Sequence, residues 1–290
     1  MRLLLALYRI YAFLLRNLPG CYMRMKSNGV AFLILRILRY RKKVILDNLR
    51  RAFPELCERD YRNIHRVFVR NFSDVFHEII RYSGFSREKL LRTIVYTNPD
   101  LVRDLSAQGK NTMILAGHFA NWELLGLTLP LVTGCKTFAA ARKQADPLFN
   151  DIINALRQKH GLEILVSQNL YRSLLKQHQH PFSVFLLADQ SPARHEVEQY
   201  LTFLGQDTPV YTGPERIARA MGMTVIFAEM TRTARGHYSV TFKTISGSPD
   251  SLEPFEITRR YNELMESMIR RQPESWLWSH RRWKHSRQDV

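Results

Sequence analysis

Residues 112–123, TMILAGHFANWE, join an apolar run, a sharp turn and a helix start. The first five residues have the length and composition of a buried strand, and Gly117 lets the chain turn sharply after it. Asn121 is of a residue type that caps helix N-termini, so we expect a helix to begin at Trp122. A buried strand followed at once by a helix is the unit from which α/β domains are built. The stretch therefore predicts an α/β fold.

The same alternation continues along the chain. Further apolar runs lie at 136–141, 162–166, 183–188 and 224–230, and helical patterns lie near 122–132, 147–160, 170–177 and 214–221. Alternating strands and helices favour a mostly parallel central sheet flanked by helices. Residues 238–243 alternate apolar and polar side chains, as a half-exposed strand at one edge of a sheet does. Residues 58–82 repeat apolar side chains at spacings of three and four, which predicts a long amphipathic helix.

The N-terminal part contains two apolar segments with basic residues. In the first, arginines at 2, 9 and 16 interrupt an apolar stretch. About fourteen helical residues span roughly 21 Å, less than the roughly 30 Å hydrocarbon core of a bilayer, so we expect this helix to lie in the membrane interface. The second, residues 30–38, leads into Arg39, Arg41, Lys42 and Lys43, whose charges suit anionic head groups. The alternative is a pair of amphipathic helices packed on the domain with solvated arginines.

We therefore predict two parts: residues 1–45 as membrane-associated helices and residues 46–290 as one α/β domain. The net charge of +17 implies an acidic partner: a nucleic acid, an anionic lipid surface, an acidic carrier protein or a phosphorylated substrate. The three cysteines are odd in number and far apart, so neither a disulfide framework nor a zinc site is expected. A reducing, cytoplasm-facing location fits this cysteine usage best.

His118 and Glu123 are the first candidates for chemistry. If His118 lies in the turn and Glu123 in the first helical turn, the carboxylate can hold an imidazole nitrogen and raise its basicity. A histidine with an acid five residues later also occurs by chance about once in a chain of this composition. A buried, hydrogen-bonded histidine or a helix cap therefore stays open as the alternative.

Other candidates are expected at the carboxyl ends of the parallel strands, where ligands of such sheets bind. Arg142 ends the run 136–141 and is either an anchor for an anion or oxyanion or a surface arginine. Asp189 follows the run 183–188 and is either a site residue or a capping or loop residue. Backbone N–H groups at the helix start next to Asn121 are further candidates for binding a negatively charged atom.

The C-terminal region mixes aromatic rings with positive charge. Its residues are Trp276, Trp278, His280, Arg281, Arg282, Trp283 and Lys284. Three interpretations compete: head-group binding at the membrane interface, phosphate binding on a substrate, and stacking on single-stranded nucleic acid. Nucleic-acid binding does not account for the N-terminal membrane-associated part, so we expect no nucleic-acid partner.

Several blocks, taken together and in order, resemble one known family, the bacterial lipid A late acyltransferases. Residues 117–123 are similar to its histidine-x4-acid signature with the ending Asn-Trp-Glu. Residues 142–157, 187–190, 203–205 and 209–213 resemble its next blocks, and residues 272–284 resemble its C-terminal block. Ala120 departs from the pattern by replacing a more usual glycine.

The resemblance implies transfer of a fatty acyl chain from an acyl thioester to a hydroxyl of a lipid A precursor, in lipopolysaccharide biosynthesis. It implies acyl carrier protein as donor, with coenzyme A as the alternative, and the cytoplasmic face of the cell inner membrane as the location. Another bacterial amino- or glycerolipid is the alternative acceptor. No cofactor and no metal are expected. His118 would act as general base and Glu123 would orient it, while Asn121, Arg142 and Asp189 would bind substrate or the oxyanion.

In the same interpretation, the membrane or lipid head groups would be contacted by two sets of residues. These are Arg39, Arg41, Lys42 and Lys43 near the N-terminus, and Trp278, Arg281, Arg282 and Trp283 near the C-terminus.

Overall fold

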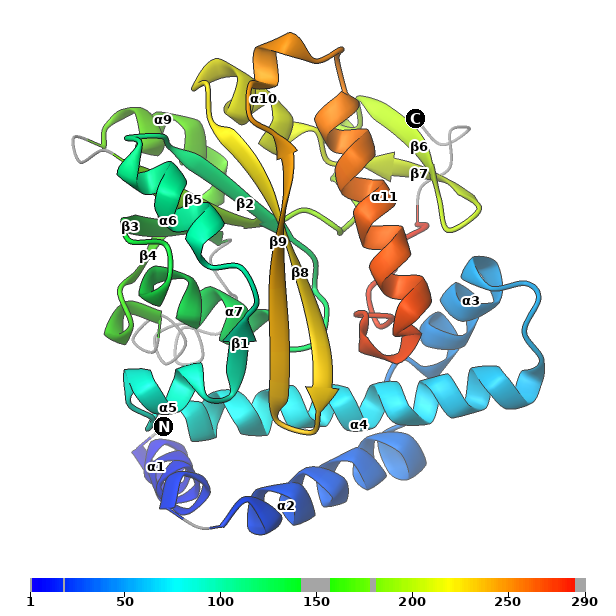
Figure 1. The fold of residues 1–290 in the computed structure, drawn as a ribbon. Coiled ribbons are helices and arrows are strands. Elements are labelled where there is room, and N and C mark those ends of the chain that lie inside the picture. Colours follow the sequence, from blue (N-terminus) through cyan, green and yellow to red (C-terminus); the bar gives the residue numbers. More distant parts are fainter. Residues whose placement is uncertain (1, 18, 142–156, 178–180, 285–290) are drawn as a thin grey trace.

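A computed structural model describes residues 2–17, 19–141, 157–177 and 181–284, which form a seven-stranded sheet flanked by helices (Figure 1). The strands are β1 (Ile94–Tyr96), β2 (Thr112–Ala116), β3 (Lys136–Ala141), β4 (Leu162–Val166), β5 (Phe182–Leu187), β6 (Gln199–Phe203), β7 (Gln206–Val210), β8 (Thr224–Ala234) and β9 (His237–Ser246). The α-helices are α1 (Arg2–Asn17), α2 (Gly20–Phe32), α3 (Lys42–Ala52), α4 (Glu58–Tyr82), α5 (Arg87–Leu91), α6 (Asp100–Ala107), α7 (Trp122–Thr128), α9 (Leu170–Leu175), α10 (Gly213–Ala220) and α11 (Glu256–Arg271). Shorter helices are the π-helix η1 (Leu33–Leu38) and the 3-10 turns η2 (Leu129–Leu131), η3 (Ser167–Asn169), η4 (Arg194–Glu196), η5 (Pro249–Ser251) and η6 (Pro273–Ser275).

The sheet confirms the predicted mostly parallel α/β fold. Its strand order is β1-β9-β8-β2-β5-β3-β4, and of these neighbours only β8 and β9 run antiparallel. The predicted bounds of β2, β3 and β4 agree with the structure. The prediction that residues 238–243 form an edge strand is wrong: β9 lies between β8 and the three-residue strand β1, which has too few residues to show a pattern in the sequence.

The register of the two central strands positions the site. Every residue of β2 is buried, and β2 pairs in parallel with β5 from Thr112 opposite Ser183 to Ala116 opposite Leu187. Because this pairing has no offset, the residues two positions after the two strand ends come to the same place on the rim. Those residues are His118 and Asp189.

The C-terminal segment returns to this rim. After α11, the chain at Trp276 forms an antiparallel bridge with Phe119, and the Ser275 carbonyl accepts a hydrogen bond from the N–H of Ala120 at 2.8 Å. The N–H of Leu277 donates to the His118 carbonyl at 3.0 Å. The turn between β2 and α7 is thus held by a segment more than 150 positions later in the sequence.

The N-terminal helices lie along one end of the molecule. The long helix α4 has the predicted bounds and crosses the end of the β8–β9 hairpin, while α1 and α2 pack on its outer side (Figure 1). Ser27 of α2 donates to the buried carboxylate of Asp74 in α4 at 2.5 Å. The predicted division at residue 45 falls inside α3. Within the ranges given above, no helix is both long and apolar enough to cross a membrane.

Candidate active site

The turn between β2 and α7 brings His118 to the carboxyl rim of the sheet. Gly117 is needed there, because a Cβ at this position would lie 3.3 Å from Cγ of Asp189 and even closer to the Met265 side chain. Glycine therefore lets the turn pass next to Asp189.

Asp189 holds His118 with two hydrogen bonds. Its Oδ1 lies 2.7 Å from His118 Nδ1, and its Oδ2 accepts from the His118 backbone N–H at 2.9 Å. Oδ2 also accepts from the indole N–H of Trp276 at 2.8 Å. In the neutral ring, a proton on Nδ1 donates a hydrogen bond to the Asp189 carboxylate. Nε2 is then the nitrogen with a free lone pair. The Gln190 amide lies 3.3 Å from Nε2.

The electrostatics of this pair favour a charged imidazole. Burial by itself lowers the pKa of His118, but the charge and hydrogen bond of Asp189, with a smaller effect of the Glu123 charge, raise it above its ordinary value. Burial likewise tends to raise the pKa of Asp189, yet the charge of His118 and the bonds from His118 and Trp276 lower it to about 2. His118 is therefore a stronger base than a free histidine, and Asp189 stays ionised beside it.

These contacts bear on two predictions. Asp189 was expected to be either a substrate or oxyanion residue or a capping or loop residue; the structure shows it buried, with three donors bonded to its carboxylate. The predicted contact between Glu123 and His118 is not formed. The Glu123 carboxylate instead accepts hydrogen bonds from Nε and Nη2 of Arg157, with a distance of 2.9 Å between Nη2 and Oε1. Glu123 pairs with Arg157 and not with His118, and the acid beside His118 comes from the segment that follows β5.

Asn121 is the helix N-cap that the sequence predicts. Its Oδ1 accepts from the Leu124 N–H at 2.9 Å, and its Nδ2 donates to Glu78 at 2.8 Å. The side chain is fully buried, and its oxygen and nitrogen both bond within the protein, so a direct contact with substrate stays a prediction. Ala120, just before it, has φ 50°, in the left-handed region that glycine favours. A glycine would adopt this backbone conformation without the strain that the alanine carries.

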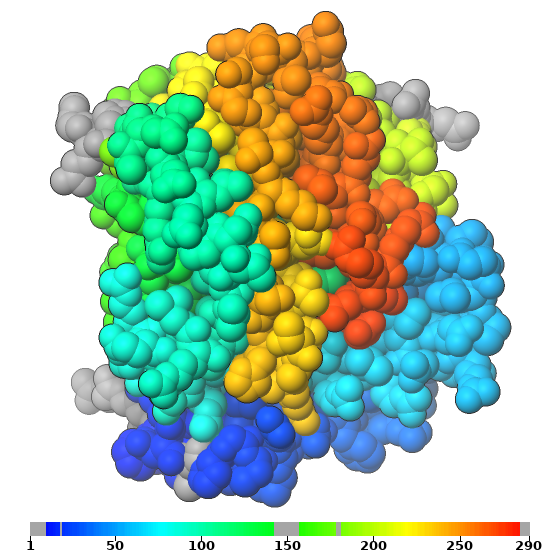
Figure 2. Space-filling view, viewed as in Figure 1, coloured from blue at the N-terminus to red at the C-terminus, as the bar shows by residue number. Residues whose placement is uncertain are grey.

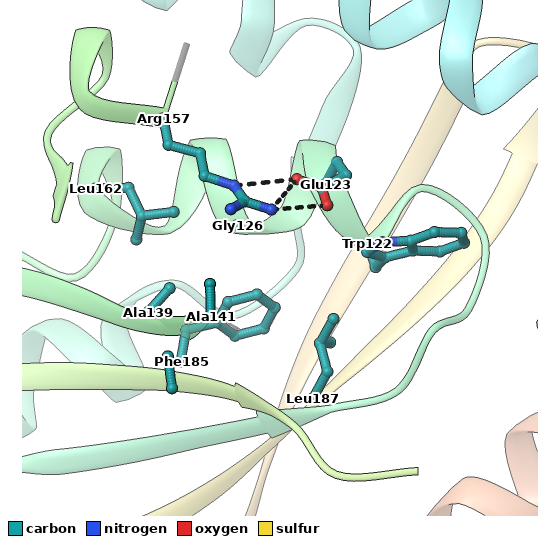
Figure 3. A pocket seen from close by; sticks show the side chains of 10 residues that line it. Trp122, Glu123, Gly126, Ala139, Ala141, Arg157, Leu162, Phe185 and Leu187 are labelled. Atoms are coloured by element: carbon teal, nitrogen blue, oxygen red, sulfur yellow. Dashed lines mark hydrogen bonds and ion pairs between the residues drawn. The ribbon is translucent and has the colours of Figure 1, made fainter. Parts of the chain in front are cut away.

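A small cavity opens beside the turn, between α7 and strands β3, β4 and β5 (Figure 3). It has a volume of about 50 Å³. Its lining residues are Trp122, Glu123, Gly126, Ala139, Ala140, Ala141, Arg157, Leu162, Phe185 and Leu187. Apart from the Glu123–Arg157 ion pair, these walls are apolar. The Trp122 ring also meets the His118 ring edge-on, with centroids 5.4 Å apart, so the cavity and the histidine share one wall.

The C-terminal cluster is mostly internal, which corrects the predicted head-group role of three residues. Trp278 is fully buried and donates to the Pro273 carbonyl. Arg282 is also buried, donates to the Pro209 carbonyl at 2.8 Å and lies over the Phe203 ring. Trp283 is half-buried and donates to Thr208 at 2.8 Å. Only Arg281 of the four is exposed, because the segment packs between the β6–β7 hairpin and α3.

The remaining predicted residues fall into two groups. Arg39, Arg41, Lys42 and Lys43 are exposed, and Arg41 also donates to the Ser279 carbonyl at 2.9 Å. Arg142 lies outside the described residues, so its predicted role stays a prediction. No group of three or more His, Cys, Asp or Glu side chains able to hold a metal ion occurs in the described parts of the chain.

Sequence reasoning missed three contacts of the site. Trp276 holds Asp189, Gln190 lies against Nε2 of His118, and Arg157 pairs with Glu123. Of these, only the contact of Gln190 could have been found from the strand register, which places residues 189 and 190 opposite the turn. The approach of the C-terminal segment to the turn has no local signal in the sequence.

Comparisons with known proteins agree with the sequence resemblance. A family model described as bacterial lipid A biosynthesis acyltransferase matches residues 2–285. The lipid A biosynthesis lauroyltransferase of Escherichia coli K12 is 23% identical over 266 residues, which cover 88% of this chain and 83% of that protein.

Proposed function

The chain belongs to the bacterial lipid A biosynthesis acyltransferase family, and we propose that it moves a fatty acyl chain from an acyl thioester to a hydroxyl of a lipid A precursor. The observation that carries this mechanism is the 2.7 Å contact between Asp189 and His118 Nδ1. It leaves Nε2 as a base at the rim of the sheet, beside an apolar cavity. The match over nearly the whole chain supports lipid A biosynthesis as the setting.

The reaction needs one proton to move twice. Nε2 of His118 takes the proton of the acceptor hydroxyl as its oxygen attacks the thioester carbonyl carbon. The tetrahedral intermediate then collapses with cleavage of the C–S bond, and His118 returns the proton to the leaving thiolate. A positioned general base contributes about 10²–10⁴-fold to such a step. Asp189 fixes the ring orientation and stabilises the imidazolium that forms.

The apolar cavity supports a place for the acyl chain. Its walls from β3, β5 and α7 offer hydrocarbon contacts within reach of Trp122, which also contacts His118. Ligand pockets typically hold about 300–1,000 Å³, so a cavity of about 50 Å³ accommodates only part of a fatty chain in this conformation. In this proposal Glu123 and Arg157 form the polar part of the wall, and the oxyanion is bound by Arg142 or by N–H groups at the start of α7.

The donor in this proposal is acyl carrier protein. This class of acidic protein is complementary to a chain of net charge +17, which would speed the encounter by electrostatic steering. Coenzyme A also carries phosphates, so purified protein should be supplied with each donor and a lipid A precursor. We expect faster transfer from the carrier protein, with a rate that falls as salt is added. Equal rates from both donors would contradict the donor assignment.

We further propose that the protein attaches peripherally to the cytoplasmic face of the inner membrane through its N-terminal helices. These form one side of the molecule (Figures 1 and 2), and their largest exposed apolar side chains are Ile10, Phe13, Met25, Phe32, Ile37 and Leu38. Exposed apolar side chains next to the exposed basic cluster 39–43 are typical of helices lying in the interface.

Neutralising Arg39, Arg41, Lys42 and Lys43 tests this attachment. Each charge near an anionic surface contributes about 1 kcal/mol, so partition to anionic vesicles should weaken by at least about tenfold. The matched control neutralises Arg103, Lys110, Arg172 and Lys176, which are exposed on or just after α6 and α9, away from α2 (Figure 1). Equal partition of both variants would contradict a role of the 39–43 cluster.

The acceptor is tested by mass spectrometry of lipid A from cells with and without the gene. We expect the mass to fall by one acyl chain in its absence. Unchanged lipid A with a changed glycerolipid or aminolipid would contradict the proposed acceptor.

A further inference from the structure

Glu78 of α4 is a buried carboxylate that contacts the helix cap of the active-site turn. Its Oε2 accepts from Asn121 Nδ2 at 2.8 Å and from the Tyr238 hydroxyl of β9 at 2.5 Å. The residue has no exposed surface, and its Oε1 has no hydrogen-bond partner among the described residues. Burying a carboxyl group so incompletely bonded costs free energy, so packing alone gives no reason for it.

The charges around Glu78 belong to one buried network. Asp74, one turn earlier in α4, pairs with Arg232 at 2.6 Å and with Arg235, both from the β8–β9 hairpin. Burial, together with the Asp74 charge, raises the pKa of Glu78 above its ordinary value, although the Tyr238 bond, the Arg232 charge and the Asn121 bond act in the opposite direction. A neutral side chain that keeps the acceptor is therefore expected to be tolerated.

Glu78 determines which way round the Asn121 amide lies. Asn121 must direct Oδ1 to the Leu124 N–H for the cap to form, and Nδ2 then points to Glu78 Oε2. If the amide were reversed, the Leu124 N–H would lose its acceptor, and Oδ1 of Asn121 would lie against Oε2 of Glu78. The residue before it, Ala120, already has an unfavourable backbone conformation, so the turn depends on contacts from outside it.

We propose that Glu78 is a positioning residue for acyl transfer, which through Asn121 fixes the turn that presents His118 and the helix that carries Glu123. This inference rests on the proposed function, because it takes the turn 117–123 as the active site. Tyr238 holds Glu78 from the sheet side, so α4 and the hairpin together set the orientation of the cap. Figure 1 shows α4 crossing the end of that hairpin.

An exchange of donor and acceptor tests the proposal. Asn121→Asp keeps an oxygen for the Leu124 N–H but sets a second carboxylate against Glu78, so we expect kcat to fall by about tenfold or more. Adding Glu78→Gln supplies an amide that donates to the new carboxylate and can still bond Tyr238. We expect the double variant to recover kcat to within about threefold of the wild type, with KM little changed in either variant.

The control is Glu215→Gln in α10. Glu215 is also a buried carboxylate, bonded to Thr258 and Arg219, but α10 lies at the opposite end of the sheet from α4 (Figure 1). We expect it to lower Tm without changing kcat. A double variant as slow as Asn121→Asp alone overturns the positioning role, provided that the wild type transfers acyl chains. A wild type without acyl transfer overturns the proposed function instead.

Tyr238→Phe keeps the test decisive if Asn121→Asp does not fold. It removes one donor to Glu78 without adding charge, and we expect kcat to fall by about threefold with KM unchanged. An unchanged kcat in a folded Tyr238→Phe protein overturns the proposal.

Discussion

Two ion pairs lie close to Trp122, which contacts His118 and lines the cavity together with Glu123 and Arg157, and the pairs differ in which polar atoms they leave unpaired. In the first, Asp189 is buried and binds Nδ1 of His118, whose side chain is 19% exposed. In the second, Glu123 and Arg157 are equally exposed, at 21% and 19%, and bind each other through several atoms. The first pair does not use Nε2 of His118, which lies 3.3 Å from the Gln190 amide. The second is satisfied internally and forms part of a cavity wall.

The difference shows that the acid nearest in sequence is not the acid that holds the base. Glu123 follows His118 by five residues, but helix α7 directs it towards Arg157. Asp189 is 71 residues away and meets His118 because β2 and β5 pair in register. The carboxylate partner of His118 is therefore determined by strand pairing and not by the spacing within residues 117–123.

The largest effect is expected from removing the base. His118→Ala should lower kcat by at least about 10²-fold, since it removes the only group assigned to take the hydroxyl proton. Acyl transfer to a lipid A precursor is the measurement, with vesicle partition expected to stay unchanged. His237→Ala, which changes an exposed histidine at the start of β9, is the control. Near-normal turnover of His118→Ala would exclude it as general base.

A smaller effect is expected from the second pair. Glu123→Gln should lower kcat/KM by about tenfold, because it leaves Arg157 without its carboxylate in the cavity wall. Adding Arg157→Gln should remove part of that loss, since two neutral amides can bond each other. A double-mutant cycle measures the coupling, which we expect to be at least about 1 kcal/mol. Strictly additive effects would show that the two residues act independently.

Much of the fold could be predicted from the sequence because its strands and long helix carry strong periodic patterns. The bounds of β2, β3, β4 and α4 show this. At the C-terminus, charge and aromatic content led to a wrong prediction of head-group contact, because Trp278 and Arg282 are buried. Their burial depends on Asn48 of α3 and the Pro209 carbonyl, which lie far away in the sequence. The partner of His118 depends on strand register, which local patterns do not determine.

The smallest effect is expected in the turn itself. Ala120 has φ 50°, and this left-handed conformation strains the folded state by roughly 1–2 kcal/mol for an alanine. A glycine avoids this strain but lowers stability by about 0.4–1 kcal/mol, because it gives the unfolded chain more conformational entropy. Ala120→Gly should therefore raise the free energy of unfolding in urea by up to about 1 kcal/mol. Ala107→Gly, at the exposed last residue of α6, should lower it slightly, since glycine costs less at a helix end than in a helix interior. Equal destabilisation by both would contradict the strain assigned to Ala120.

The pH dependence of kcat/KM tests most directly whether Asp189 sets the basicity of His118. The base must be neutral to accept a proton, so the rate should rise with pH, with a midpoint above the ordinary histidine pKa of about 6.5. Asp189→Asn should move the midpoint to lower pH and slow the reaction, because burial then dominates the His118 pKa. Glu123→Gln should move it much less. A midpoint that shifts with Glu123→Gln and stays in place with Asp189→Asn would contradict the account.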